Sequence, residues 1–136
     1  MQVIHEAIPI DTHDNIEIIN ITGNIKDIIR KYDITNGIIS ISTKHTTSSI
    51  MINEDEEGLK KDYLNFLEKL VPQGNYLHDR IDNNATSHLK AMLTTPTQSL
   101  SIIDGKINLG IWQSIFFVEL DGPRQNRSVN VTIIGN

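Results

Sequence analysis

The sequence predicts an α+β domain in which antiparallel or mixed sheets are combined with about three helices. Two observations predict this class. Most apolar stretches are rich in Ile and Val and end at turn-forming residues, which is typical of strands, and three stretches show helical spacing. The helical stretches do not alternate regularly with the strands, which argues against a repeated βαβ unit. The chain of 136 residues is expected to form one domain over residues 1–136.

The N-terminal part predicts two strands, a helix and a longer strand. Two β-rich runs, 2–10 and 15–21, flank a polar turn and predict a hairpin. Apolar residues at helical spacing within 24–36 predict a short helix that ends at Asn36-Gly37. Residues 37–52 return to a β-rich pattern and are expected to form one long strand from which His45 projects.

The central part contains the clearest helical pattern. Acidic residues at 54–57 precede it and Pro72 follows it, as expected for the two ends of a helix. Its apolar stripe is expected to pack on a sheet, and consists of Leu59, Tyr63, Phe66, Leu67 and Leu70. Residues 73–83 show no periodicity and predict a surface loop, and 86–94 predict a short helix with His88 in its first turn.

The C-terminal part predicts only strands. The runs 99–103, 106–120 and 127–134 are β-rich and are separated by turn residues. Asp104-Gly105 between two apolar runs is a strong signal for a tight hairpin.

Composition excludes several classes of function. The chain has no cysteine, so thiolate catalysis, disulfide scaffolds and cysteine zinc sites are excluded. A net charge of −5 argues against nonspecific binding to nucleic acid or to anionic membranes. The N-terminus lacks the pattern of a signal peptide, and no apolar run approaches the length of a membrane span, so a cytoplasmic location is expected.

Three of the five histidines lie in polar segments and are the main candidates for chemistry: His45, His78 and His88. If the fold brings them together, they would form a metal site or an acid/base site. Each also has an ordinary interpretation, as a strand histidine, as a solvated loop residue beside Asp79, or as part of an exposed helical turn.

Other candidates lie near the histidines in sequence. The hydroxyls of Thr46 and Thr47 can donate to phosphate oxygens, although threonine also simply favours strands. Arg124 and Arg127 can clamp an anion or remain solvated. The sequence contains no P-loop, dinucleotide fingerprint, HExxH or nucleophile elbow.

Six separated motifs stand out along the chain: His45-Thr46-Thr47-Ser48-Ser49, Asn53-Glu54, Leu70-Val71-Pro72, Tyr76-Leu77-His78-Asp79, His88-Leu89-Lys90-Ala91 and Gly110-Ile111-Trp112-Gln113. In order and spacing they closely resemble the YjbQ family, whose members are small proteins often labelled secondary thiamine-phosphate synthases. The resemblance spans roughly residues 3 to 135.

The resemblance implies a sandwich-like α+β fold, a homotrimer, and a pocket in which the three histidines hold a divalent metal ion or a phosphate-like anion. Zinc and magnesium are both plausible metals. The motif positions implied to lie near that pocket are Asn53, Glu54, Trp112 and Gln113. Ile111 replaces a small hydroxyl residue of the family pattern and removes a possible hydrogen bond, whereas Thr97 replaces serine and keeps one.

The activity implied by the resemblance is a weak or secondary transfer reaction. It joins a hydroxymethylpyrimidine diphosphate to a thiazole phosphate and releases pyrophosphate. A metal held by the histidines, with Glu54 as a further carboxylate, would stabilise the leaving diphosphate, and Trp112 would form an apolar wall for the pyrimidine. Thr46, Thr47 and Arg124 are the expected phosphate contacts. Two alternatives remain open: a module that binds a metal or phosphorylated metabolite without turnover, and a metal-dependent hydrolase.

Overall fold

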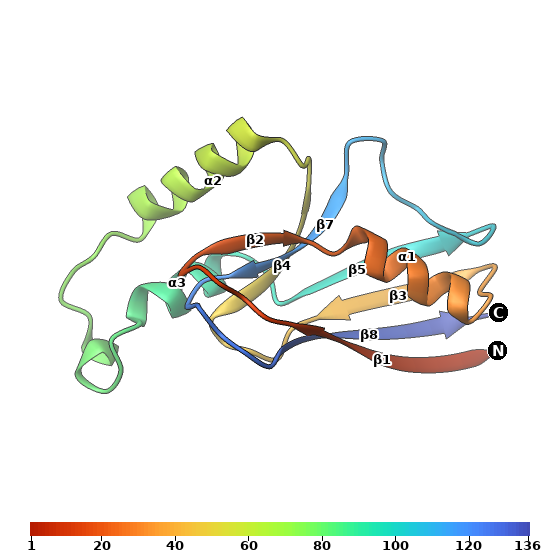
Figure 1. The fold of residues 1–136 in the computed structure, drawn as a ribbon, viewed down its shortest axis with the longest axis horizontal. Coiled ribbons are helices and arrows are strands. Elements are labelled where there is room, and N and C mark those ends of the chain that lie inside the picture. The colour runs from red at the N-terminus through yellow and green to blue at the C-terminus, as the bar shows by residue number, and fades with distance from the viewer.

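The computed structural model describes all of residues 1–136 and contains two antiparallel sheets (Figure 1). The larger sheet has five strands, in the spatial order β1 (Gln2–Ile10), β8 (Arg127–Gly135), β3 (Gly37–Ser42), β5 (Thr97–Ile103) and β6 (Lys106–Ile107). The smaller sheet has three, in the order β2 (Glu17–Asn20), β7 (Ser114–Glu119) and β4 (Ser48–Asn53). The α+β class with antiparallel sheets and three helices is therefore confirmed.

The core lies between the large sheet on one side and the small sheet with α1 (Thr22–Lys31) on the other. In β8, Val129, Val131 and Ile133 alternate with more exposed residues, so one face of this strand packs inward. Helix α1 adds Ile25 and Ile29 from its buried face. Because the strand and the helix each bury one face in this core, the sequence shows the alternating apolar pattern of a strand and the apolar spacing of a helix.

Strand β7 is buried on both faces because α2 (Glu57–Leu70) covers the side of the small sheet that faces away from the main core. On that side Phe116 and Val118 pack against Leu67 of α2. The expected apolar stripe of α2 packs only in part, since Leu67 is buried and Tyr63 half-buried, whereas Phe66 and Leu70 remain exposed. Periodicity identified the helix but not the extent of its contact.

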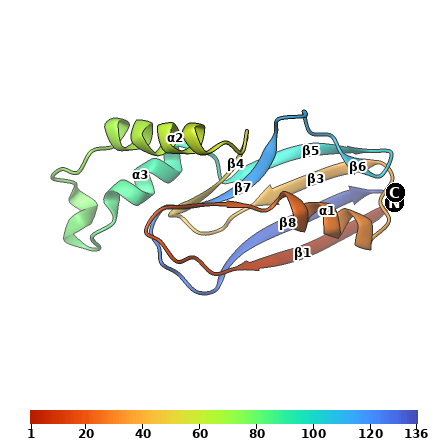
Figure 2. The same cartoon turned by 45° about the horizontal axis from the view of Figure 1, so that its top comes forward.

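An arm of helical segments extends from one end of the sheets, away from the two chain termini (Figure 2). It comprises α2, the short 3-10 turn η1 (Leu77–Arg80) and α3 (Ala85–Leu93). Glu56 caps α2 by accepting hydrogen bonds from the backbone N–H groups of Gly58 and Leu59. Lys90 of α3 is buried and pairs with Glu68 of α2, which ties the two helices together. None of the helices combines the length and apolar character that a membrane crossing requires.

Three expectations about the strands were wrong, one about pairing and two about strand length. β1 and β2 do not form a hairpin, because β1 pairs with β8 in the large sheet and β2 with β7 in the small one. Residues 37–52 do not form one strand, because the chain leaves the large sheet after Ser42 and enters the small sheet at Ser48. Residues 106–120 are likewise divided between β6 and β7. The Asp104-Gly105 hairpin is confirmed, with φ angles of 52° and 79°.

Candidate functional site

A polar cavity of about 430 Å³ lies where the β3–β4 loop, the start of α3 and the segment after β7 meet. No apolar side chain lines it. The lining residues are Lys44, His45, Thr46, Thr47, Asp82, Asn84, His88, Asp121, Arg124 and Arg127. Two of the three candidate histidines and all three expected phosphate contacts therefore face one space. We call it the polar cavity.

A buried ion pair forms the base of this region. Glu119 is fully buried and accepts two hydrogen bonds from Arg127, Nε to Oε1 at 2.9 Å and Nη2 to Oε2 at 2.7 Å. The Glu119 carboxylate also accepts from Thr12 Oγ1 at 2.8 Å and from the backbone N–H of Asp121 at 3.0 Å. Arg127 in turn donates to Thr47 Oγ1 at 2.8 Å. The pair thus links three separate chain segments and fixes the position of Thr47.

The pKa of Glu119 shows that these hydrogen bonds outweigh the cost of burial. Burial alone would raise the pKa of this carboxyl group. The hydrogen bonds from Arg127, Thr12 and the Asp121 backbone, together with the charge of Arg127, lower it more than burial raises it, so the net pKa lies below the usual value. Glu119 is therefore ionised at neutral pH, and the positive charge of Arg127 is largely committed to it.

His45 lies in the loop between β3 and β4, not on a strand as expected. Its Nε2 accepts a hydrogen bond from the backbone N–H of Ser128 at 3.1 Å. Burial, followed by the nearby charge of Arg127, lowers the pKa of the ring. A neutral ring that accepts at Nε2 carries its proton on Nδ1, so the remaining ring nitrogen of His45 is an N–H donor. His45 can bind a metal only if it changes tautomer or gives up the bond to Ser128.

His78 and His88 meet at the junction of η1 and α3. Their ring centroids are 4.6 Å apart with an interplanar angle of 76°. His78 Nε2 lies 3.0 Å from Asn84 Oδ1, and Asn84 Nδ2 donates to Asp121 Oδ2 at 2.8 Å. Arg124 Nη2 donates to the same Asp121 oxygen at 2.9 Å. A chain of hydrogen bonds therefore connects η1 to the wall of the polar cavity.

An apolar pocket of about 360 Å³ adjoins this histidine pair. Its lining residues are Tyr76, Leu77, His78, Ala85, His88, Leu89 and Met92. His88 lines both the polar cavity and the apolar pocket. The two spaces together can receive a molecule that has an anionic group at one end and an apolar ring at the other.

The structure does not assemble a closed histidine cluster within one chain. No group of three or more His, Asp or Glu side chains is placed to hold a metal ion. His45 and His88 line the polar cavity, whereas His78 faces the apolar pocket. Asp79, next to His78 in sequence, accepts from the backbone N–H of Ala85 at 2.9 Å and so supports the start of α3. The three-histidine metal site stays a prediction.

The other four site candidates lie at the far end of the small sheet. Ser48 pairs with Glu119 near the polar cavity, and Asn53 pairs with Ser114 at the opposite end of the β4–β7 ladder. Five residues of strand separate these two ends, which corresponds to about 17 Å. Asn53, Glu54, Trp112 and Gln113 all lie at or beyond the far end, and Trp112 is 70% exposed. One chain therefore does not bring them to His45.

Five residues of the cavity region were missed by sequence reasoning: Lys44, Asp82, Asn84, Glu119 and Asp121. A single lysine beside a candidate histidine carries no distinguishing signal. Asp82, Asn84 and Asp121 follow the ordinary pattern of turn residues, so nothing in the sequence distinguished them. Glu119 carried a usable signal, because it is a single carboxylate in an otherwise apolar strand. Such a residue must be either exposed or paired inside the protein.

Comparisons with known proteins agree with this fold. The family model described as UPF0047 protein YjbQ-like matches residues 6–136. A UPF0047 protein of Methanothermobacter thermautotrophicus is 43% identical over 99% of this chain and 94% of its own length. A YbjQ-like protein of unknown function from Sulfolobus solfataricus P2 has a crystal structure that matches with a TM-score of 0.96 at 37% identity, covering 99% of both chains.

A conserved protein of the YjbQ/UPF0047 family from Clostridium acetobutylicum also has a matching crystal structure. The match has a TM-score of 0.87 at 35% identity and covers 96% of this chain and 99% of that one. The family model and these relatives cover nearly the whole chain. The chain belongs to the YjbQ-like UPF0047 family.

Proposed function

We propose that this protein binds a phosphorylated heteroaromatic compound across the polar cavity and the apolar pocket, and acts on it as a thiamine-phosphate synthase-like transferase. One observation carries this proposal: His88 lines both spaces, so an anionic group and a flat apolar ring can be held side by side. A hydroxymethylpyrimidine diphosphate has both parts.

The residues of the polar cavity suit the departure of a diphosphate group. In the proposed reaction a ring nitrogen of the thiazole phosphate forms a bond to the methylene carbon of the pyrimidine, while the carbon–oxygen bond to the diphosphate breaks. Lys44 and Arg124 would supply positive charge, and Thr46 and the Nδ1–H of His45 would donate hydrogen bonds. The pyrimidine would occupy the apolar pocket, between Tyr76 and Met92.

A divalent metal is part of the proposal, and the chemistry of the donors favours magnesium over zinc. Magnesium commonly binds one or two carboxylates together with substrate phosphates, whereas structural zinc needs about four protein ligands. Asp82 and Asp121 line the polar cavity and offer such carboxylates, but His45 Nε2 is already bonded to Ser128. When bound with the diphosphate, magnesium would neutralise charge on the leaving group.

We further propose that the protein assembles as a homotrimer in which neighbouring subunits complete each site. The two groups of candidate residues lie at opposite ends of the β4–β7 ladder, so they can act together only across an interface. Ile111 and Trp112 are 89% and 70% exposed, as expected for apolar side chains that a partner covers. A head-to-tail interface closes into a three-membered ring when neighbouring subunits are related by a third of a turn.

The direct test is product analysis by mass spectrometry with both substrates and added magnesium. We expect thiamine phosphate from the unchanged protein, and loss of activity by at least about 100-fold in His45→Ala and in His88→Ala if these rings act on the substrate. His5→Ala is the matched control, because His5 lies in β1 and bonds only Thr132. Absence of product from folded, magnesium-loaded protein would refute the transferase. In that case, saturable binding of either substrate without turnover would identify a binding module. Release of free phosphate would identify a hydrolase.

Mixing two inactive variants tests the shared site. His45→Ala and Trp112→Ala, unfolded and refolded together in equal amounts, should regain about a quarter of the original activity, because one interface in four would combine two intact halves. A mixture of His45→Ala and His88→Ala should regain nothing, since both side chains line the same cavity. If the first mixture also stays inactive, the site does not use Trp112 from a second subunit.

A further inference from the structure

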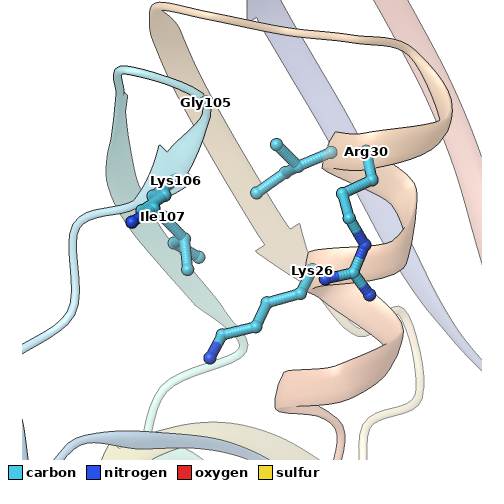
Figure 3. Close-up of a pocket in the computed structure, with 6 residues that line it drawn as sticks. Lys26, Arg30, Gly105, Lys106 and Ile107 are labelled. Atoms are coloured by element: carbon cyan, nitrogen blue, oxygen red, sulfur yellow. The ribbon is translucent and has the colours of Figure 1, made fainter.

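A third space, of about 460 Å³, lies between α1 and the β5–β6 hairpin, away from the polar cavity and the apolar pocket (Figure 3). Its lining residues are Lys26, Ile29, Arg30, Gly105, Lys106 and Ile107. Ser42 pairs with Thr97 at the end of the large sheet near His45, whereas Gly37 pairs with Ile102 at the end near Gly105. This basic pocket is therefore separated from the polar cavity by the length of β3.

Three of the six lining residues are cationic, and no carboxylate lines the pocket. Lys26 and Lys106 make no ion pair, and Arg30 pairs only with the exposed Asp27 on its own helix. Figure 3 shows Lys26 and Arg30 projecting from α1, with Lys106 on the neighbouring hairpin. Such a concentration of positive charge in a chain with a net charge of −5 favours an anionic ligand.

The floor of the pocket is apolar. Ile29 is 2% exposed and Ile107 is 8% exposed, and both belong to the main core. An inorganic ion would interact with the cationic rim alone, whereas an anion with an apolar body would also cover the two isoleucines. The combination therefore selects for an organic anion.

The walls of the pocket are connected before any ligand binds. The backbone N–H of Gly105 donates to the carbonyl of Thr35 at 2.8 Å, and that of Asp104 donates to Asn36 Oδ1 at 3.3 Å. Thr35 and Asn36 follow α1 in the chain, so these bonds fix the hairpin relative to the helix. A pocket with fixed walls loses less conformational entropy on binding.

We propose that the basic pocket is a second ligand site, which binds a small organic phosphate whose apolar part lies on Ile29 and Ile107 and whose phosphate contacts Lys26, Arg30 and Lys106. This proposal is independent of any activity at the polar cavity. It requires only that the cationic rim and the apolar floor act on one molecule.

Titration of the ¹⁵N-labelled protein with phenyl phosphate tests the proposal by NMR. We expect saturable shifts of the Gly105 and Ile107 amides, and weaker binding of inorganic phosphate at equal ionic strength. Loss of two charged contacts in Lys26→Gln/Lys106→Gln should weaken phenyl phosphate binding about tenfold or more. Lys61→Gln/Lys69→Gln removes the same charge from α2 and should leave the affinity unchanged.

Three results would overturn the proposal. The Gly105 and Ile107 amides could fail to shift saturably, both double variants could weaken binding equally, or inorganic phosphate could bind as tightly as phenyl phosphate. Binding at the polar cavity is distinguished by shifts near Asn84 and Asp121 instead. His45→Ala should abolish shifts there and preserve those at Gly105.

Discussion

Replacing Arg127 by methionine is expected to lower the free energy of unfolding by about 3–5 kcal/mol, because it leaves a buried charge without its partner. Glu119 is fully buried and receives two of its hydrogen bonds from Arg127. Methionine preserves much of the side-chain volume but donates no hydrogen bond, so the effect reports the lost charge rather than a cavity. Urea unfolding at neutral pH, followed by circular dichroism, measures it.

Two further variants separate the buried pair from ordinary surface charge. Arg124→Met breaks a half-exposed pair with Asp121 and should cost no more than about 1 kcal/mol. Glu119→Gln/Arg127→Met removes both charges and should be more stable than Arg127→Met alone. If Arg127→Met and Arg124→Met cost the same, the interpretation of the buried pair is wrong.

The pH dependence of stability should change sign for this carboxyl group. In the unchanged protein the pKa of Glu119 is lowered, so its stabilisation is present above the pKa of the unfolded chain and is lost as the pH falls through the lowered value. In Arg127→Met, burial acts without the arginine and raises the pKa. Protonation in mild acid should then relieve the buried charge and stabilise the variant.

Gly122→Ala is expected to destabilise the protein by about 1–3 kcal/mol and to displace one wall of the polar cavity. A Cβ atom at Gly122 would lie far inside van der Waals contact with the carbonyl oxygen of Asp14, and 2.9 Å from Glu119 Cγ. The segment that follows is held by Arg124, whose backbone N–H donates to Thr12 Oγ1 at 2.8 Å. The added methyl group would strain that attachment.

Gly23→Ala is the matched control for this change. Gly23 lies in α1, and a Cβ atom there would meet nothing within 4 Å. Alanine favours helix over glycine, so this variant should be equal to the unchanged protein or more stable by up to about 1 kcal/mol. Thermal unfolding compares the two variants, and amide spectra of Asp121 and Arg124 report the cavity wall. Equal stability of both variants would contradict this prediction, because it would show that the segment around Gly122 moves to accept the added methyl group at little cost in free energy.

Most strands could be predicted from the sequence, but apart from the β5–β6 hairpin their partners could not. Ile and Val alternation marks the buried face of β8, yet it contains no information on which strand lies beside it. The run 37–52 predicts one strand because residues 43–47, where the structure breaks it, include three threonines and neither glycine nor proline. The structure turns there by local side-chain bonds instead, including Thr43 Oγ1 with Ser48 Oγ at 2.8 Å.

The candidate site was predictable where a residue type is unusual and unpredictable where it is common. His45 and His88 were singled out as histidines and indeed line one cavity. Asn84 and Asp121 connect that cavity to His78, but their types are typical of turns, and the hydrogen bond between them joins residues 37 apart in sequence. Trp112 matched a motif, and only the β4–β7 register reveals how far it lies from His45.

The pairing of β1 with β8 has a consequence for the order in which the chain can fold. Gln2 pairs with Gly135, and β8 also lies between β1 and β3. During synthesis β1 therefore stays separated from the rest of the large sheet until β8 has left the ribosome, although β1 itself leaves much earlier. Contacts this distant in sequence form slowly because a long loop must close first. A nascent chain would carry two unpaired strand edges throughout, which makes the wait for β8 the period of greatest exposure to aggregation.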